Sequence, residues 1–187
     1  MELPRIFPIT SEIDSLEKIL ISLPLLLQKN ISSFLYRRKN LNSKIVDKEL
    51  FILESICSKL NISLFINSHH EKDTSIFFTG MHLTQQDLKK LKRREIDKTK
   101  LLGASCHCLE DIKKAEILEV DYIFLSPVKR TESKINYLPL GWKKFSSLCN
   151  ETTLPVYALG GMQEKDLPEA QKKGAYGIAG ISRFWSD

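Results

Sequence analysis

The sequence has no long apolar run, although 42% of its 187 residues are hydrophobic. The longest such stretch, residues 20–27, is interrupted by Ser22 and Pro24, so no membrane-spanning helix is expected. The opening stretch MELPRIFPITSEID lacks a basic region followed by an apolar one, which argues against a signal peptide. Four cysteines at irregular positions do not suit a disulfide framework and favour thiols in a reducing compartment. We therefore expect a cytoplasmic protein.

Low-complexity linkers and shifts in composition are missing too. The length suits one domain with a sizeable core and is short for two, so a single domain over residues 1–187 is expected. A net charge of +5 suits an anionic ligand. The densest basic stretch, residues 89–100, carries no interleaved aromatic residue and suits a solvated helix face. Nucleic-acid binding is therefore not expected.

What the sequence does contain is an alternation of strand-like and helix-like segments. Several strand-like segments are apolar on consecutive residues, as in strands buried on both faces. They cover residues 5–10, 31–36, 62–67, 75–80, 101–106, 121–126, 155–160 and 176–181. Amphipathic patterns predict helices over residues 16–29, 44–60, 84–96, 108–118, 141–149 and 166–174.

Eight strands alternating with helices predict parallel pairing, either in a closed (β/α)8 barrel or in an open doubly wound sheet. Only HHEKDT separates the third and fourth strands, and only SRFWSD follows the eighth. A (β/α)8 barrel usually needs roughly 200 residues or more. We therefore predict a TIM barrel trimmed at the helices after strands three and eight, with Pro24 kinking or ending part of the first helix.

Three strand ends carry groups that suit a phosphate. Ligands of parallel α/β folds bind at the carboxyl ends of the strands, and the loops after the last two strands commonly hold phosphate. Those loops contain the glycine-rich segments ALGGM (158–162) and GIAGIS (177–182). The preceding strand runs into LSPVKRTESK, which gathers hydroxyl groups and cations. Together they predict a phosphate-type ligand.

Several segments resemble the thiamine phosphate synthase and thiazole tautomerase family. The densest likeness is in GASCHCLEDIKKAEILEVDYIFLSPVKRTESK, LPVYALGGM and GIAGIS. GMHLTQQDL resembles the family's fourth-strand element GVHLGQEDL, YRRKN resembles its R-x-K element, and FINSH resembles its I-N-D-R element. The nearest likeness is to synthase-like domains fused behind Nudix hydrolases, which share the LGW at residues 140–142.

The resemblance implies a (β/α)8 barrel that joins a pyrimidine diphosphate to a thiazole phosphate and releases pyrophosphate with Mg²⁺. It implies catalytic roles for His107, Ser105 and Lys134 and a metal ligand in Asp87. The implied phosphate-binding residues are Arg37, Lys39, Asn67, Thr131, Ser133, Lys134, Gly160, Gly161, Ile181 and Ser182. The expected partners are small phosphorylated heterocycles, and the oligomeric state stays open, a homo-oligomer included.

Two positions depart from the family pattern. Ser68 replaces the first family aspartate that would hold Mg²⁺, and Leu35 replaces a family glutamine. Both changes weaken the synthase interpretation. Two alternatives remain: a thiazole phosphate tautomerase with His107 as base, and a barrel that binds such anions without turnover as a partner of a Nudix hydrolase.

Other side chains are given structural interpretations. Cys106, His107 and Cys108 alternate between faces, with His82 as the only evident helper, so buried thiols are expected rather than a metal site. The pair His69–His70 is expected to face solvent. The rings at 137, 142 and 145 could close over a substrate, but the helical spacing of the last two favours the core.

Overall fold

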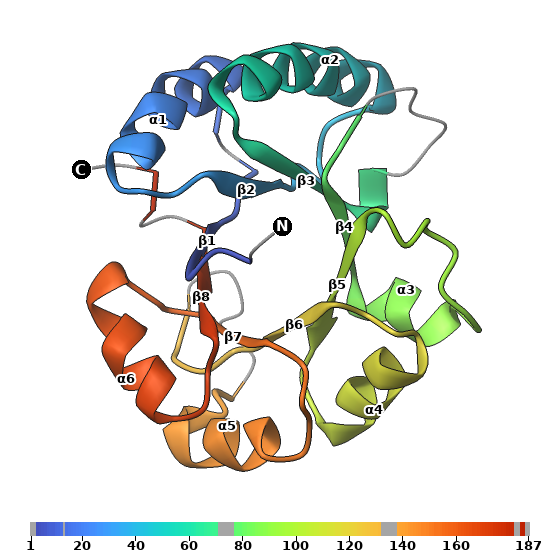
Figure 1. Cartoon of the computed structure of the whole chain (residues 1–187), viewed down its shortest axis with the longest axis vertical. Coiled ribbons are helices and arrows are strands. Elements are labelled where there is room, and N and C mark those ends of the chain that lie inside the picture. The colour runs from blue at the N-terminus through green and yellow to red at the C-terminus, as the bar shows by residue number, and fades with distance from the viewer. Residues whose placement is uncertain (1–2, 13, 71–76, 132–137, 182–183, 186–187) are drawn as a thin grey trace.

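Eight parallel strands form one sheet in the computed structural model, which describes residues 3–12, 14–70, 77–131, 138–181 and 184–185. The strands are β1 (Ile6–Pro8), β2 (Ser33–Tyr36), β3 (Ser63–Asn67), β4 (Gly80–Leu83), β5 (Leu101–Cys106), β6 (Tyr122–Leu125), β7 (Val156–Leu159) and β8 (Gly177–Gly180). The helices are α1 (Leu16–Gln28), α2 (Ser43–Leu60), α3 (Gln85–Lys90), α4 (Leu109–Ile117), α5 (Gly141–Cys149) and α6 (Leu167–Lys172). Helices surround the ring of strands in Figure 1. None of them is long and apolar enough to cross a membrane.

The sheet curls into a barrel rather than staying open. The strand order is β1-β8-β7-β6-β5-β4-β3-β2, so the remaining seam lies between β1 and β2. A single bridge, Ile9 to Leu35, closes this seam, and the Thr10 amide donates to the Leu35 carbonyl at 3.0 Å. The Thr10 hydroxyl continues the ladder by accepting from the Arg37 amide at 2.8 Å. The predicted (β/α)8 barrel is confirmed.

The predicted trimming is also borne out in the described residues. After β3 only a 3-10 turn, η1 (Ser68–His70), is described before residue 77, and residues 181, 184 and 185 after β8 form no helix. The expectation that Pro24 would end part of the first helix is wrong, because α1 continues to Gln28. Pro24 lies on the exposed side, where the missing backbone donor is tolerated.

Two predicted boundaries are wrong. The fourth strand was predicted at 75–80 from its apolar letters, but it spans Gly80–Leu83, and Phe77 is exposed. Gly80 fixes this register because it pairs with Phe65 and Leu101, and a Cβ there would lie 2.6 Å from the Phe65 ring. The helix predicted over 84–96 ends at Lys90. Beyond it, Arg94 donates to the carbonyls of Ile96 and Lys100 and folds the basic stretch back on itself.

Aromatic rings fill the barrel below its carboxyl end. The interior residues of this cluster are Phe7, Ile9, Leu35, Phe65, Tyr122, Phe124, Tyr157 and Ala179. The Phe7 ring lies at the centre, with ring centroids 4.9–5.6 Å from Phe65, Tyr122, Phe124 and Tyr157. Gly103 makes room for Tyr122, because a Cβ there would overlap the Tyr122 ring. The second hydrophobic cluster, between sheet and helices, forms the outer layer.

His82 lies on top of these rings. Its imidazole is 1% exposed, with its centroid 4.2 Å from that of Phe124. The Nε2 atom lies 3.0 Å from the Ser105 hydroxyl and Nδ1 lies 3.4 Å from the Tyr122 hydroxyl. Burial, with a smaller effect of the Arg37 cation, lowers the pKa of His82 to about 3. His82 is therefore neutral in the folded protein.

A second buried histidine belongs to a polar network outside the barrel. Arg38 donates to both oxygens of Glu49 in α2, at 2.7 and 2.9 Å, and the Tyr36 hydroxyl donates to the same carboxylate at 2.6 Å. His70 accepts the Arg38 amide through Nε2 at 2.9 Å. Burial lowers its pKa to about 4. The expectation that the histidine pair faces solvent thus holds for His69 and is wrong for His70.

We predict that His70 and His82 make the fold sensitive to mild acid. Both have folded pKa values below the ordinary 6.5, so the unfolded chain binds protons that the folded one does not. Their contribution to the free energy of unfolding is complete above a pH of about 6.5. It is lost as the pH falls to about 4 for His70 and to about 3 for His82, with a slope of about 1.4 kcal/mol per pH unit for each histidine. Urea unfolding at several pH values measures this slope.

The matched variants are His82→Gln, His70→Gln and His69→Gln. His82→Gln and His70→Gln are each expected to reduce the change of the free energy of unfolding with pH by about 1.4 kcal/mol per pH unit. His69→Gln, which changes an exposed histidine, is the control. An unchanged slope in both buried variants would contradict the prediction.

Candidate active site at the carboxyl ends of the strands

The end of β2 supplies two cations, Arg37 and Lys39. Leu35 faces the barrel interior and Tyr36 the outer layer, so alternation turns Arg37 toward the barrel mouth. Arg37 pairs with Glu12 at 3.2 Å, and Glu12 also accepts the Asn40 amide. Burial lowers the pKa of Arg37, and burial together with the Arg37 cation lowers that of Lys39. An anion arriving here would compete with Glu12 and relieve the repulsion between the cations.

Ser68 lies directly against Asp87, the predicted metal ligand. Its hydroxyl donates to Asp87 Oδ2 at 2.7 Å, and the Thr84 hydroxyl donates to the same oxygen at 2.6 Å. Ser68 in turn accepts the Thr84 amide at 3.0 Å. These hydroxyl bonds lower the pKa of Asp87 against the opposing effect of burial. Asp87 is therefore ionised, and its Oδ2 atom accepts two hydrogen bonds.

This arrangement fits Mg²⁺ only in part. Mg²⁺ prefers one or two carboxylates, substrate phosphates and water. Asp87 can serve as one ligand, but the serine hydroxyl beside it is a donor to the carboxylate rather than a second anion. Across the described ranges, no three His, Cys, Asp or Glu side chains gather as metal ligands. Asp87 would thus hold the ion with water and substrate oxygens completing its shell.

Asn67 and Ser105 lie near the ends of β3 and β5, the two strands on either side of β4. Asn67 is buried, and its Oδ1 accepts the His69 amide at 3.2 Å, so this oxygen holds the η1 turn. Ser105 is half-buried and is held from below by His82. The Asn67 oxygen thus supports the η1 turn, whereas the Ser105 hydroxyl lies at the barrel mouth.

His107 lies above Ser105 at the beginning of the β5–α4 loop. Its Nδ1 lies within hydrogen-bond distance of the Ser126 carbonyl, which requires the proton on Nδ1 and leaves the basic lone pair on Nε2. The His107 backbone amide donates to Asp111 at 2.9 Å, and Gln85 donates to the same oxygen at 2.6 Å. The imidazole is half-buried. Its tautomer and position are therefore fixed by β6 and α4.

The loops after β6 and β7 pack against each other. Gly160 and Gly161 have φ values of 101° and 66°, which favour glycine. A Cβ at Gly160 would lie 2.8 Å from Pro127, and one at Gly161 would lie 2.6 Å from the Arg130 carbonyl. The Lys129 amide donates to the Gly160 carbonyl, and Lys129 pairs with Asp166 at 2.9 Å. Contact between the loops therefore accounts for these glycines, whether or not phosphate binds.

The remaining predicted residues lie partly outside the described chain. Thr131 is half-buried at the end of the β6 loop, and Ile181 is half-buried one residue beyond β8. Ser133, Lys134 and Ser182 lie outside the described residues, as does Tyr137. Phe145 is buried and Trp142 packs on it at 5.6 Å, so the core interpretation of that pair is confirmed. Cys106 is buried and Cys108 half-buried.

Electrostatic and hydrogen-bond links gather the described site residues at one mouth. Arg37 acts on His82 and Lys39, and Asp87 acts on Lys39, which ties the ends of β2 and β4 together. His107 joins β5 to β6, and the glycine loop joins β6 to β7. Sequence reasoning missed the roles of four supporting residues: His82, Thr84, Asp111 and Ser126. The signal for Thr84 was present, because Thr-x-x-Asp before an apolar residue is a capping pattern.

Comparison with known proteins indicates one enzyme family. Residues 6–184 match the family model described as thiamine monophosphate synthase. A putative thiamine-phosphate synthase 2 of Aquifex aeolicus is 33% identical over 184 residues, covering 98% of this chain and 99% of that protein. The thiamine-phosphate synthase of Persephonella marina is 32% identical, covering 81% and 73%.

A solved structure supports the fold. The thiamine phosphate pyrophosphorylase of Pyrococcus furiosus aligns with a TM-score of 0.73 at 21% identity, over 95% of this chain and 85% of that chain. That likeness speaks for the barrel alone, whereas the family model spans nearly all of the chain. The chain belongs to the thiamine monophosphate synthase family.

Proposed function

We propose that this protein is a thiamine phosphate synthase-like transferase of reduced activity. It would join a pyrimidine diphosphate to a thiazole phosphate in thiamine biosynthesis. Family membership supports the reaction class. The reduced activity is carried by one observation: the Ser68 hydroxyl donates to Asp87 at the position where the family motif has a second carboxylate.

The chemistry needs anion binding more than proton transfer. The bond from the pyrimidine methylene to the diphosphate oxygen breaks, pyrophosphate leaves with the electron pair, and the thiazole nitrogen forms the new bond to carbon. Arg37, Lys39 and Thr131, with Ser133 and Lys134 by family likeness, would neutralise the leaving group. Bound Mg²⁺ would share that charge, with Asp87 holding it. Gly160, Gly161, Ile181 and Ser182 would hold the thiazole phosphate through backbone amides.

The site would stabilise the leaving group less well than one with two carboxylates. Mg²⁺ held through a single carboxylate is free to shift as charge builds on the pyrophosphate. Loss of one such fixed contact typically costs about 3 kcal/mol, or about a hundredfold in rate. Substrate phosphates and water could still complete the shell, so Asp87 would still hold the ion.

We predict that Ser68→Asp raises pyrophosphate release by about a hundredfold at saturating Mg²⁺. The new carboxylate would face Asp87, so without a cation the two would repel and the variant would melt at a lower temperature than wild type. Pyrophosphate release and thermal unfolding, each measured with and without Mg²⁺, test both halves.

Ser68→Ala is the matched control, because it removes the hydroxyl without adding charge. It is expected to show no gain in rate and no new dependence of stability on Mg²⁺. Robust wild-type turnover that Ser68→Asp leaves unchanged would contradict the proposal and indicate a fully competent synthase.

A thiazole phosphate tautomerase is the second candidate, and the His107 tautomer favours it. Donation from Nδ1 to the Ser126 carbonyl puts the basic lone pair on Nε2, as a base for moving a ring proton requires. This reaction needs the monophosphate subsite and a base but no departing pyrophosphate. The incomplete metal site would then be no handicap.

We predict that His107→Asn lowers any thiazole proton exchange by about a hundredfold or more, because such bases contribute on that order. Exchange is followed as deuterium incorporation into thiazole phosphate in heavy water. His69→Asn, which changes an exposed histidine, is the control and should exchange like wild type. Equal exchange in wild type and His107→Asn would exclude His107 as the base.

Other expectations stay predictions. They are the single domain and the cytoplasmic location. The oligomeric state stays open, a homo-oligomer included. So does the alternative of a phosphate-binding barrel without turnover that partners a Nudix hydrolase. Absence of both pyrophosphate release and proton exchange, with retained binding of thiazole phosphate, would favour the last of these.

A further inference from the structure

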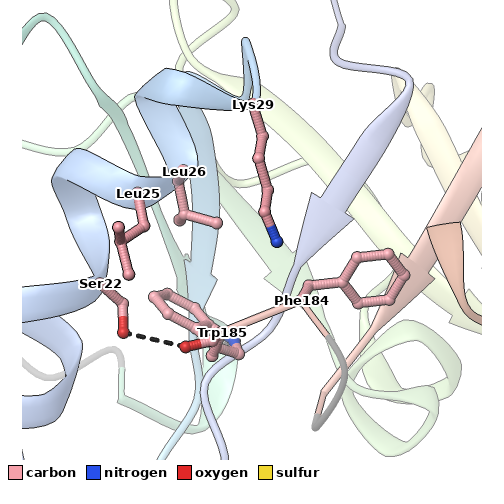
Figure 2. Close-up of a pocket in the computed structure, with 6 residues that line it drawn as sticks. All are labelled: Ser22, Leu25, Leu26, Lys29, Phe184 and Trp185. Atoms are coloured by element: carbon pink, nitrogen blue, oxygen red, sulfur yellow. Dashed lines mark hydrogen bonds between the residues drawn. The ribbon is translucent and has the colours of Figure 1, made fainter. Parts of the chain in front are cut away.

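The segment that follows β8 is anchored by two buried rings. Phe184 is 1% exposed and Trp185 is 5% exposed. Figure 2 shows the two side chains pointing in opposite directions, Trp185 toward α1 and Phe184 away from it. They occupy the place where a barrel helix after β8 would cover the sheet. In the described residues of this segment, contacts of the Phe184 and Trp185 rings thus take the place of helix packing.

Trp185 is bound to three elements at once. Its indole Nε1 donates to the Ile9 carbonyl, just beyond β1, at 2.8 Å. Its ring meets Phe34 of β2 edge to face at 5.5 Å. Its carbonyl accepts the hydroxyl of Ser22 in α1 at 3.1 Å, the bond drawn in Figure 2. This side chain therefore spans the β1–β2 seam, which has only one bridge of its own.

Phe184 lies directly on Gly180, the last residue of β8. A Cβ at Gly180 would overlap the Phe184 ring, so this glycine provides the space for that ring. The Gly180 carbonyl also accepts the Ile9 amide at 2.8 Å. Ile9 is thus held by Gly180 through its N–H and by Trp185 through its C=O. The two rings and Ile9 fix the chain on both sides of Ile181.

We propose that Trp185 is a positioning residue for the monophosphate subsite, acting through Ile9 and Gly180 on the backbone around Ile181. The inference rests on the proposed function, in which that backbone and the Gly160–Gly161 loop hold the thiazole phosphate. The Gly180 carbonyl and the Ile181 amide belong to one planar peptide unit, so the bond from Ile9 to that carbonyl fixes the direction of the Ile181 amide. An amide that is fixed before the anion arrives loses little conformational entropy on binding. On the diphosphate side of the site, the Trp185 ring contacts Phe34 of β2, and Trp185→Phe keeps a ring against it, so this side should change little when the indole N–H is lost.

The main variant is Trp185→Phe, which keeps a ring against Phe34 and removes the indole donor. A milder variant, Ser22→Ala, removes only the bond to the Trp185 carbonyl and tests the proposal should Trp185→Phe fold poorly. Leu53→Ala is the control, because Leu53 is fully buried in α2 and its loss destabilises the fold away from β8. Affinities for thiazole phosphate and pyrimidine diphosphate are measured separately by calorimetry, at a temperature where every variant is folded.

Trp185→Phe is expected to weaken thiazole phosphate binding about fivefold to tenfold, the usual worth of one hydrogen bond. Ser22→Ala should give a smaller loss in the same direction, and pyrimidine diphosphate should bind both variants like wild type. Leu53→Ala should change neither affinity. Equal loss for the two ligands, or wild-type affinity for both in a folded Trp185→Phe, would overturn the positioning role.

Amide hydrogen exchange separates this inference from the proposed function. The Ile9 amide is expected to exchange about tenfold faster in Trp185→Phe, since a lost hydrogen bond is worth that much in opening. If wild type binds neither ligand, the proposed function fails, and faster Ile9 exchange would still support the link from Trp185 to β8. Unchanged Ile9 exchange would overturn that link whatever the ligands do.

Discussion

The aromatic rings inside the barrel are the feature on which the rest of the structure depends. Phe7 contacts four rings from β3, β6 and β7, so one side chain from β1 joins strands around most of the barrel. These close-packed rings form the apolar floor of the mouth. Burial against this floor keeps His82 neutral, and His82 holds the Ser105 hydroxyl. A functional group placed on such a floor keeps its geometry because its support cannot rearrange.

Most of the architecture could be predicted because buried parallel strands are apolar on consecutive residues and recur at even intervals. The failures have identifiable causes. Phe77 and Phe78 resemble a strand core, yet only Phe78 is buried, and the strand register is fixed by the small residue Gly80. Arg94 ends a helical pattern through long-range bonds that local spacing does not reveal. His70 is buried against the segment that follows β2, where the Arg38 amide donates to it.

The glycines show why the candidate site was only partly predictable. The sequence predicts phosphate binding at Gly160 and Gly161, and their conformations do suit a tight loop. Yet Pro127, Arg130 and, at Gly180, Phe184 each occupy the space that a Cβ would take. Glycine therefore satisfies a packing requirement at all three positions, and phosphate binding would use backbone that packing has already placed. Asp87 has the same double character, since its amide donates to Thr84, the N-cap of α3, while its carboxylate faces the mouth.

The two adjacent arginines that follow β2 make contacts that depend on the register of this strand. Arg37 points to the mouth and Arg38 to the outer layer, so a slip of one residue would exchange them while keeping a guanidinium group on each side. The positive charge at the barrel mouth would change little, because either arginine supplies a guanidinium group there. Glu49 would be affected, because its carboxylate would lose the Tyr36 hydroxyl and the two bonds from Arg38. Packing of α2 through Glu49 thus favours the observed alignment of β2. The position of Arg37 at the anion site therefore depends on contacts on the opposite face of the sheet.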